Sequence, residues 1–122
     1  MPYSISREKS GLLTKWWGSA SNSELIQMQQ YLHAHPDFEL LRYSLHDLSE
    51  CDYFAWSHDE AAVSSALDGA ASRTNPRLKI AIVGANSEVL KSIDAYMNIG
   101  LSPYPLRIFA FMDEARVWVM ET

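Results

Sequence analysis

The feature that most constrains the fold is the strand–helix unit formed by residues 78–100. Its first part, residues 78–83, is short and aliphatic and stops at Gly84, which is typical of a strand. Asn86 then predicts the start of a helix, because its side chain can accept a hydrogen bond from the first turn. Gly100 predicts the end of that helix, since glycine adopts the left-handed conformation without a Cβ clash. A unit of this kind predicts an α/β fold.

The beginning of the chain predicts two strands followed by a helix. Residues 3–8 and 12–17 are separated by a Lys-Ser-Gly turn and predict a β-hairpin. Ser21 and Glu24 then have the spacing of a capping box, in which each side chain satisfies a free backbone N–H group. The helix that they open would end at Pro36, because proline cannot donate the next hydrogen bond.

The middle of the chain predicts a strand, a loop and a second helix. Residues 38–45 indicate the strand and residues 47–56 the loop. A second capping-box pattern at Ser57 and Glu60 predicts an alanine-rich helix through about residue 71. Small apolar residues would form its inner face: Val63, Ala66, Leu67 and Ala70.

The end of the chain completes the alternation. Residues 105–111 predict the last strand, and the carboxylates of Asp113 and Glu114 suit the start of a short final helix. The order β-β-α-β-α-β-α-β-α predicts right-handed crossovers and a mostly parallel five-stranded sheet. The N-terminal edge strand would be antiparallel. We expect residues 1–122 to form a single domain.

Strands in consecutive order, all connected with one hand, predict helices on one face of the sheet. The other face would carry Arg42, Ser44, His46, Lys79, Ala81, Val83, Arg107, Phe109 and Phe111. Parallel sheets seldom leave a face bare. We therefore expect the N-terminal segment, a second subunit or a ligand to cover this face, with solvation as the alternative.

Composition excludes few functions but indicates the cellular compartment in which the protein acts. The formal charge of -5 argues against a general nucleic-acid binder, because affinity for phosphates comes from clustered lysine and arginine. Cys51 is the only cysteine, so no intrachain disulfide can form and a reducing compartment fits. The N-terminus lacks the apolar run of a signal peptide, and no stretch has the length of a membrane span. These features predict a cytoplasmic protein.

Three segments resemble the STAS superfamily, the family of anti-sigma-factor antagonists. They are residues 45–49 (Leu-His-Asp-Leu-Ser), 75–84 (Asn-Pro-Arg-Leu-Lys-Ile-Ala-Ile-Val-Gly) and 108–118. Within that superfamily, the chain more closely resembles an uncharacterised bacterial branch, the STAS/CRAL-TRIO-like proteins. It implies a right-handed β-α superhelix and a non-enzymatic regulatory module that binds a kinase-like partner. In that family a serine between a strand and the next helix is switched by phosphorylation; here Trp56 falls at its position, with Ser57 as the nearest hydroxyl.

The sequence contains no pattern that predicts catalysis, a cofactor or a metal. Ser57 fits a helix cap better than a phosphorylation site. His33 and His35 are spaced so that their side chains diverge on a helix, and no acidic or cysteine partner has ligand spacing. Acidic neighbours disfavour a reactive thiolate at Cys51. The turn that follows Gly84 lacks the glycines and the lysine of a phosphate loop.

Clustered aromatic residues form the candidate ligand or partner surface. Tyr53, Phe54 and Trp56 crowd the end of a predicted strand beside Ser57, while Phe109 and Phe111 end the last strand. Exposed rings would indicate a protein-binding regulatory module, and a concave pocket would indicate a carrier of a small apolar ligand or lipid. The third interpretation is that these rings only pack over the end of the sheet and bind nothing. We expect the regulatory module, associating as a homodimer through the open sheet face or the hairpin edge.

Overall fold

The computed structural model describes residues 2–121, which form one five-stranded sheet with four α-helices and one 3₁₀ helix. The elements are β1 (Tyr3–Arg7), β2 (Gly11–Ser19), α1 (Asn22–Ala34), η1 (Phe38–Leu40), β3 (Tyr43–Tyr53), α2 (His58–Ala71), β4 (Lys79–Val83), α3 (Ser87–Ile99), β5 (Leu106–Phe109) and α4 (Met112–Met120). None of the helices in residues 2–121 is long and apolar enough to cross a membrane.

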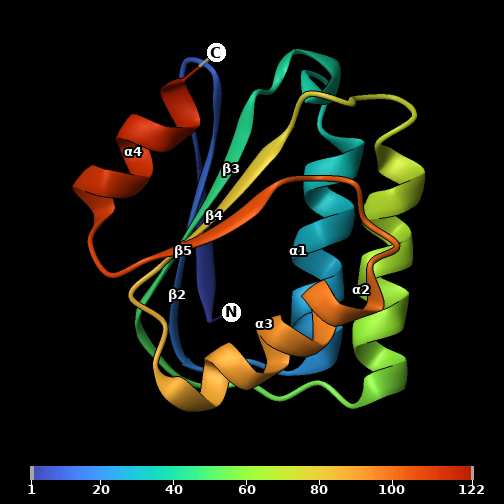
Figure 1. The fold of residues 1–122 in the computed structure, drawn as a ribbon. Helices are drawn as coiled ribbons and strands as arrows, with labels where there is room; N and C mark the ends of the chain where they lie inside the picture. The colour runs from blue at the N-terminus through green and yellow to red at the C-terminus, as the bar shows by residue number, and fades with distance from the viewer. Residues whose placement is uncertain (1, 122) are drawn as a thin grey trace.

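The sheet has the predicted topology. Its strands lie in the order β1-β2-β3-β4-β5, with β1 antiparallel to β2 and all other neighbours parallel. Figure 1 shows α1, α2 and α3 on one side of the sheet and α4 on the other. The prediction of an α/β fold with an antiparallel N-terminal edge strand is therefore confirmed.

Local signals place the helix boundaries where the sequence predicts them. The Ser21 hydroxyl accepts from the Glu24 N–H at 3.2 Å, and the Ser57 hydroxyl accepts from the Glu60 N–H at the same distance. Both capping boxes are complete, because each glutamate side chain also accepts from the backbone of its serine. Gly100 ends α3 with a φ of 72°, in the left-handed region.

The prediction for residues 38–56 is partly wrong. Residues 38–40 form the 3₁₀ helix η1, because the buried Asn75 side chain donates to the carbonyls of Phe38 and Leu41, both at 2.7 Å. The strand β3 begins only at Tyr43 and continues to Tyr53, through most of the predicted loop. Register shifts against β2 break the alternation of apolar and polar residues in this part of β3, so the pattern does not indicate a strand.

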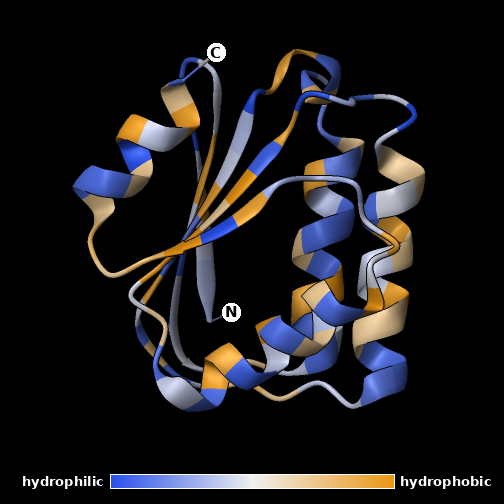
Figure 2. Ribbon diagram, viewed as in Figure 1, coloured by the Kyte–Doolittle hydropathy of each residue, from blue (hydrophilic) through white to orange (hydrophobic). Residues whose placement is uncertain are grey.

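The predicted inner face of α2 is also wrong. Val63 and Ala66 are exposed, while polar residues face inward: Ser64, Ser65 and Asp68 are buried. Figure 2 shows both hydrophilic and hydrophobic stretches along α2. The inward polar residues find hydrogen-bond partners on other elements, and this pairing makes their burial tolerable.

The second face of the sheet is covered by α4 and is not open. Ala115, Trp118 and Val119 of α4 pack on a cluster of strand residues: Tyr43, Leu45, Ala81 and Val83. Phe109 joins them, with its ring centroid 5.8 Å from that of Trp118. The expected facing is correct for β4 and for Arg107 and Phe109 of β5. Phe111 was expected on the same face but lies beyond β5, just before α4. The expected facing of β3 is wrong, because Ser44 and His46 face α1–α3. The prediction assumed that Leu41 continues the strand and shares a face with Tyr43 and Leu45. Leu41 instead lies just before β3 and packs in the main core, on the other side of the sheet.

Polar contacts hold α4 at its C-terminal end and at its middle. Lys79 donates from Nζ to the carbonyl oxygens of Trp118 and Glu121, at 2.9 and 2.8 Å, where a cation opposes the helix dipole. Arg116 makes a bidentate pair with Glu8, at 3.0 and 2.9 Å. Tyr43 also donates to Glu8, at 2.6 Å. These contacts tie the C-terminal helix to the hairpin and to the two central strands.

Replacing Glu8 tests this attachment. The hydrogen bond from Arg116 lowers the pKa of Glu8 below its ordinary value of 4.5. A lowered folded-state pKa means that Glu8 stabilises the fold above pH 4.5 and loses this effect as the pH falls through the lower value. Glu8→Gln should lower the free energy of unfolding by about 1 kcal/mol at pH 7. Its effect should shrink toward pH 3, as urea titrations would measure.

The exposed Glu39 is the matched control for Glu8. No side-chain hydrogen bond of Glu39 is found within residues 2–121, so Glu39→Gln should change stability little at any pH. Equal effects of the two substitutions would contradict the role given to Glu8.

Replacing Ser57 tests its role as a cap. Ser57→Ala removes the acceptor for the Glu60 N–H and should lower the free energy of unfolding by about 1 kcal/mol. Ser87, exposed in the first turn of α3, provides the comparison, and Ser87→Ala should have little effect. Stoichiometric phosphorylation of Ser57 in cells, together with a change of binding partner, would overturn the assignment as a cap alone.

Candidate functional site

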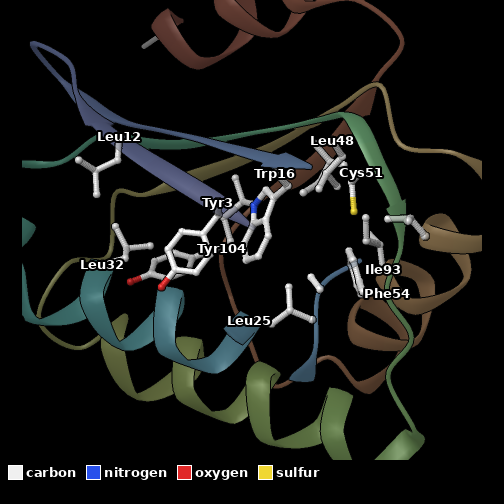
Figure 3. Close-up of a cluster of buried hydrophobic side chains, with 14 of the residues drawn as sticks. Tyr3, Leu12, Trp16, Leu25, Leu32, Leu48, Cys51, Phe54, Ile93 and Tyr104 are labelled. Atoms are coloured by element: carbon white, nitrogen blue, oxygen red, sulfur yellow. The ribbon is translucent and has the colours of Figure 1, made fainter. Parts of the chain in front are cut away.

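A cavity of about 90 Å³ lies between the sheet and the layer formed by α1, α2 and α3. Its apolar walls include Trp16 of β2 and Leu25 of α1, which face each other across this space in Figure 3. Leu48, Phe54 and Ile93 continue the wall toward the carboxyl end of β3. The cavity is therefore part of the main core, at the level where the helices approach the sheet.

Aromatic rings form one end of the cavity. Trp56 lies between Phe54 and Tyr96, with ring centroids 5.6 and 6.1 Å away. Its backbone N–H donates to the Ser92 hydroxyl at 3.0 Å, which fixes the segment between β3 and α2 against α3. Phe54 is buried and Trp56 is half-buried. The rings thus close the cavity where the chain leaves the sheet.

Polar groups from α1 and α2 meet at the helical side of the cavity. Gln29 donates to the Ser64 carbonyl at 2.8 Å and accepts from the Ser64 hydroxyl at 3.0 Å. Both residues are buried, and each satisfies the other. This reciprocal pair joins α1 to α2 without any charge.

Asp68 carries a carboxylate into the same layer. Its Oδ1 accepts from His33 Nε2 at 2.9 Å, and its Oδ2 accepts from the Tyr96 hydroxyl. Only 6% of Asp68 is exposed, so these two bonds replace the water that the carboxylate loses. Burial and the adjacent carboxylate raise the pKa of Tyr96, so the tyrosine remains a hydrogen-bond donor.

His46 of β3 lines the cavity from the sheet side. Trp16 donates from Nε1 to His46 Nδ1 at 3.4 Å, so the proton of the neutral ring is on Nε2. Nε2 then donates to the Ser44 hydroxyl oxygen at 3.0 Å. Burial lowers the pKa of His46 to about 4, against a smaller opposing effect of Asp68. His46 is therefore neutral at physiological pH.

The Ser44–His46 pair does not have the arrangement of a nucleophile and its base. A base would accept the serine proton, whereas His46 Nε2 carries the proton and donates it to Ser44. The other ring nitrogen receives an indole N–H instead of facing the carboxylate that orients a catalytic histidine. Within residues 2–121, no three histidine, cysteine or acidic side chains are grouped so that they could hold a metal ion.

The indole nitrogen of Trp56 is an exception among the buried polar atoms. It is buried and has no hydrogen-bond partner within residues 2–121; the other buried side-chain atom in that condition is Asn22 Oδ1, which does not line the cavity. Leaving a buried donor unpaired costs roughly 1–3 kcal/mol. An acceptor placed beside Trp56 would recover this cost.

The residues predicted to form one surface lie in separate parts of the structure. Phe54 and Trp56 line the cavity, while Tyr53 is 51% exposed at the end of β3 and Ser57 caps α2. The other two aromatic residues lie with α4: Phe109 packs on Trp118, and Phe111 is the exposed residue just before the helix. The six residues therefore do not form one surface.

Sequence reasoning missed the polar half of the cavity. The residues concerned are Gln29, Ser44, His46, Ser64, Asp68 and Tyr96. Ser64 and Asp68 are four residues apart on α2, and Gln29 and His33 have the same spacing on α1. This matched polar spacing on two neighbouring helices was the available signal. Cys51 is buried as well, and burial, more than its acidic neighbours, raises the pKa of its thiol.

The pH dependence of stability reports on His46. Because its folded-state pKa of about 4 lies below the ordinary 6.5, His46 favours folding above pH 6.5 and progressively loses this effect as the pH falls toward 4. The loss amounts to about 3 kcal/mol. His46→Gln should flatten urea-unfolding stability between these pH values. His58→Gln, at an exposed histidine, should not, and equal slopes in both variants would contradict the assignment.

Comparisons with known proteins bear on the fold. No protein-family model and no curated protein matches the chain. Among solved structures, it is similar to the anti-sigma factor antagonist SpoIIAA in its unphosphorylated form, with a TM-score of 0.61 and 8% identity over 98% of this chain and 99% of that one. It is also similar to the phosphorylated form of the Bacillus cell fate determinant SpoIIAA, with a TM-score of 0.59 and 11% identity over 96% and 98% of the chains.

A further similar structure is an uncharacterized DUF3478-family protein from Shewanella loihica PV-4 with a SpoIIAA-like fold. Its TM-score is 0.56, with 19% identity over 96% of this chain and 91% of that one. Likeness at such low identity shows the fold alone. The resemblance noted in the sequence is confirmed at that level: the chain has a SpoIIAA-like fold.

Proposed function

We propose that this protein is a non-enzymatic regulatory module that acts by binding another protein. The likeness to SpoIIAA, an anti-sigma factor antagonist, over nearly the whole of both chains supports this proposal. Fold likeness alone does not assign a function, so the proposal also needs a surface on this chain. The buried and unpaired Cys51 fits action in a reducing compartment such as the cytoplasm.

The outer surface of α4 is the partner surface that we propose. Phe111, Val117 and Met120 are 70%, 66% and 62% exposed, and only Leu40, at 68%, is comparable among the large hydrophobic residues described. Val117 and Met120 are three residues apart on α4, and Phe111 lies just before it. Exposed apolar residues on and beside one element favour a protein contact over solvent. The first partner to test is a second copy of the chain, because twofold association is the commonest way to cover such a surface.

The proposed module differs from a phosphorylation-switched one. Trp56 stands where the STAS resemblance places the switched serine, and the Ser57 hydroxyl is engaged in its capping box. We therefore propose that partner binding does not depend on phosphorylation at this turn.

Charge placed on α4 tests the proposed surface. Val117→Asp should weaken association with the partner at least tenfold, because binding would bury the new carboxylate. Leu40→Asp is the matched control: it places the same charge on an equally exposed apolar residue of η1 and should leave association unchanged. Sedimentation velocity measures self-association, and capture from an extract of the source cells measures binding to other proteins.

Two outcomes would contradict the proposed surface. In one, the wild-type protein is monomeric at micromolar concentration and captures nothing that Val117→Asp fails to capture. In the other, the two variants lose the partner equally, which would place the contact away from α4.

The cavity beneath Trp56 favours a second candidate function. We propose that the protein carries a small ligand with an apolar body in this space, which is lined by Trp16, Leu25, Phe54 and their neighbours. Native mass spectrometry of the purified protein tests this directly. A carrier should retain a bound mass that is lost on denaturation.

A further inference from the structure

We infer that two copies of this chain associate through the free edge of β1, so that their two sheets join into one continuous sheet. The inference goes beyond the proposed α4 contact, because it concerns a different surface of the molecule. Three observations carry it: the direction of the backbone groups of β1, the side chains that pairing of the strand with itself brings together, and a groove beside the strand.

The outer side of β1 presents backbone groups that no other strand of the sheet pairs with. β1 is an edge strand, and β2 is its one neighbour. Trp17 donates from its N–H to the carbonyl of Pro2 at 2.9 Å, and Glu8 donates from its N–H to the carbonyl of Gly11 at 2.8 Å. The even-numbered residues of this segment therefore direct their backbone groups toward β2. The odd-numbered residues direct theirs to the free edge: Tyr3, Ile5 and Arg7. An edge of this kind pairs readily with a further strand.

A second copy of β1 fits this edge because the strand is complementary to itself. In an antiparallel pair centred on Ile5, each Ile5 meets its counterpart, and Tyr3 of one copy lies opposite Arg7 of the other. Outward backbone groups then meet outward backbone groups along the whole strand. Arg7 is the one residue of β1 that carries a formal charge. In this register it faces a tyrosine ring instead of a like charge, which favours the pairing.

The opposite face of β1 is compatible with the same register. Tyr3 belongs to the main core, so the alternation along the strand directs Ser4 and Ser6 to the α4 side of the sheet. Both serines are exposed. In the inferred pair Ser4 of one copy lies opposite Ser6 of the other, and hydroxyl groups that face each other across strands form hydrogen bonds. No charged side chains of β1 are brought together on this face.

A groove beside β1 supplies apolar contact area. About 220 Å³ of space lies between the strand and α1, lined by Tyr3, Ser4, Ile5 and Tyr31. Tyr3 points toward α1, where its hydroxyl donates to Gln27 at 2.8 Å (Figure 3). Tyr31 is 53% exposed in a single copy. Because Ile5 of each copy lies on this face beside the shared edge, the second copy places its Ile5 in the groove against Tyr31.

Disulfide cross-linking tests the register. Residues in non-hydrogen-bonded pairs of antiparallel strands have Cα atoms about 4.5 Å apart, a distance that a disulfide spans. Ser4 and Ser6 of opposite copies form such a pair in the inferred register. A mixture of full-length Ser4→Cys and Ser6→Cys chains should therefore form covalent dimers in oxidised glutathione at least tenfold faster than either variant alone. Cys51 is buried, and the wild-type chain provides the baseline for its reaction.

Charge placed in the groove tests the contact. Tyr31→Asp would bury a carboxylate beside Ile5 of the second copy and should weaken self-association at least tenfold, as sedimentation velocity measures. Tyr53→Asp is the matched control: Tyr53 is 51% exposed at the end of β3, and its replacement should leave self-association unchanged. Val117→Asp separates this contact from the α4 contact, because a dimer formed through β1 persists in that variant.

Three outcomes would overturn the inference. A wild-type protein that is monomeric at micromolar concentration would exclude the β1 contact, while capture of another protein that Val117→Asp loses would still support the α4 surface. Cross-linking of Ser4→Cys alone as fast as that of the mixture would exclude the register. Self-association that is lost in Val117→Asp but kept in Tyr31→Asp would assign the dimer to α4 instead of β1.

Discussion

One carboxylate, that of Asp68, joins the three helices that cover the main face of the sheet. It lies on α2 and accepts hydrogen bonds from His33 of α1 and Tyr96 of α3. A buried carboxylate is tolerated only where such partners replace its hydration. The positions of α1 and α3 relative to α2 are therefore constrained by directional bonds as well as by apolar packing. The polar side of the cavity is a direct consequence, because Asp68, Ser64 and Gln29 occupy positions that apolar side chains would otherwise fill.

The two faces of the sheet are stabilised in different ways. The face toward α1–α3 combines a large apolar core with hydrogen bonds between helices. The face toward α4 has a small core, centred on Trp118, and α4 depends on Lys79 and Glu8 for its attachment. Lys79 also lies over the Trp118 ring, at 5.1 Å from its centroid, so one cation holds both the end of the helix and its main anchor.

Features that depend on neighbouring residues could be predicted from the sequence, and features that depend on distant partners could not. The capping boxes at Ser21 and Ser57 and the end of α3 at Gly100 are decided within four residues, and all three predictions were correct. The inner face of α2 is decided by side chains about 30 residues away, which makes Asp68 face inward while Val63 remains exposed. The same distinction holds for the candidate site. The cluster of aromatic residues near the end of β3 indicated Phe54 and Trp56, whereas no local pattern indicated His46.

The position of His46 shows how the fold suppresses reactivity that its residue types would allow. A serine hydroxyl 3.0 Å from an imidazole is the beginning of a catalytic arrangement, but the indole of Trp16 fixes the opposite tautomer. Burial disfavours the imidazolium that general-base catalysis would form.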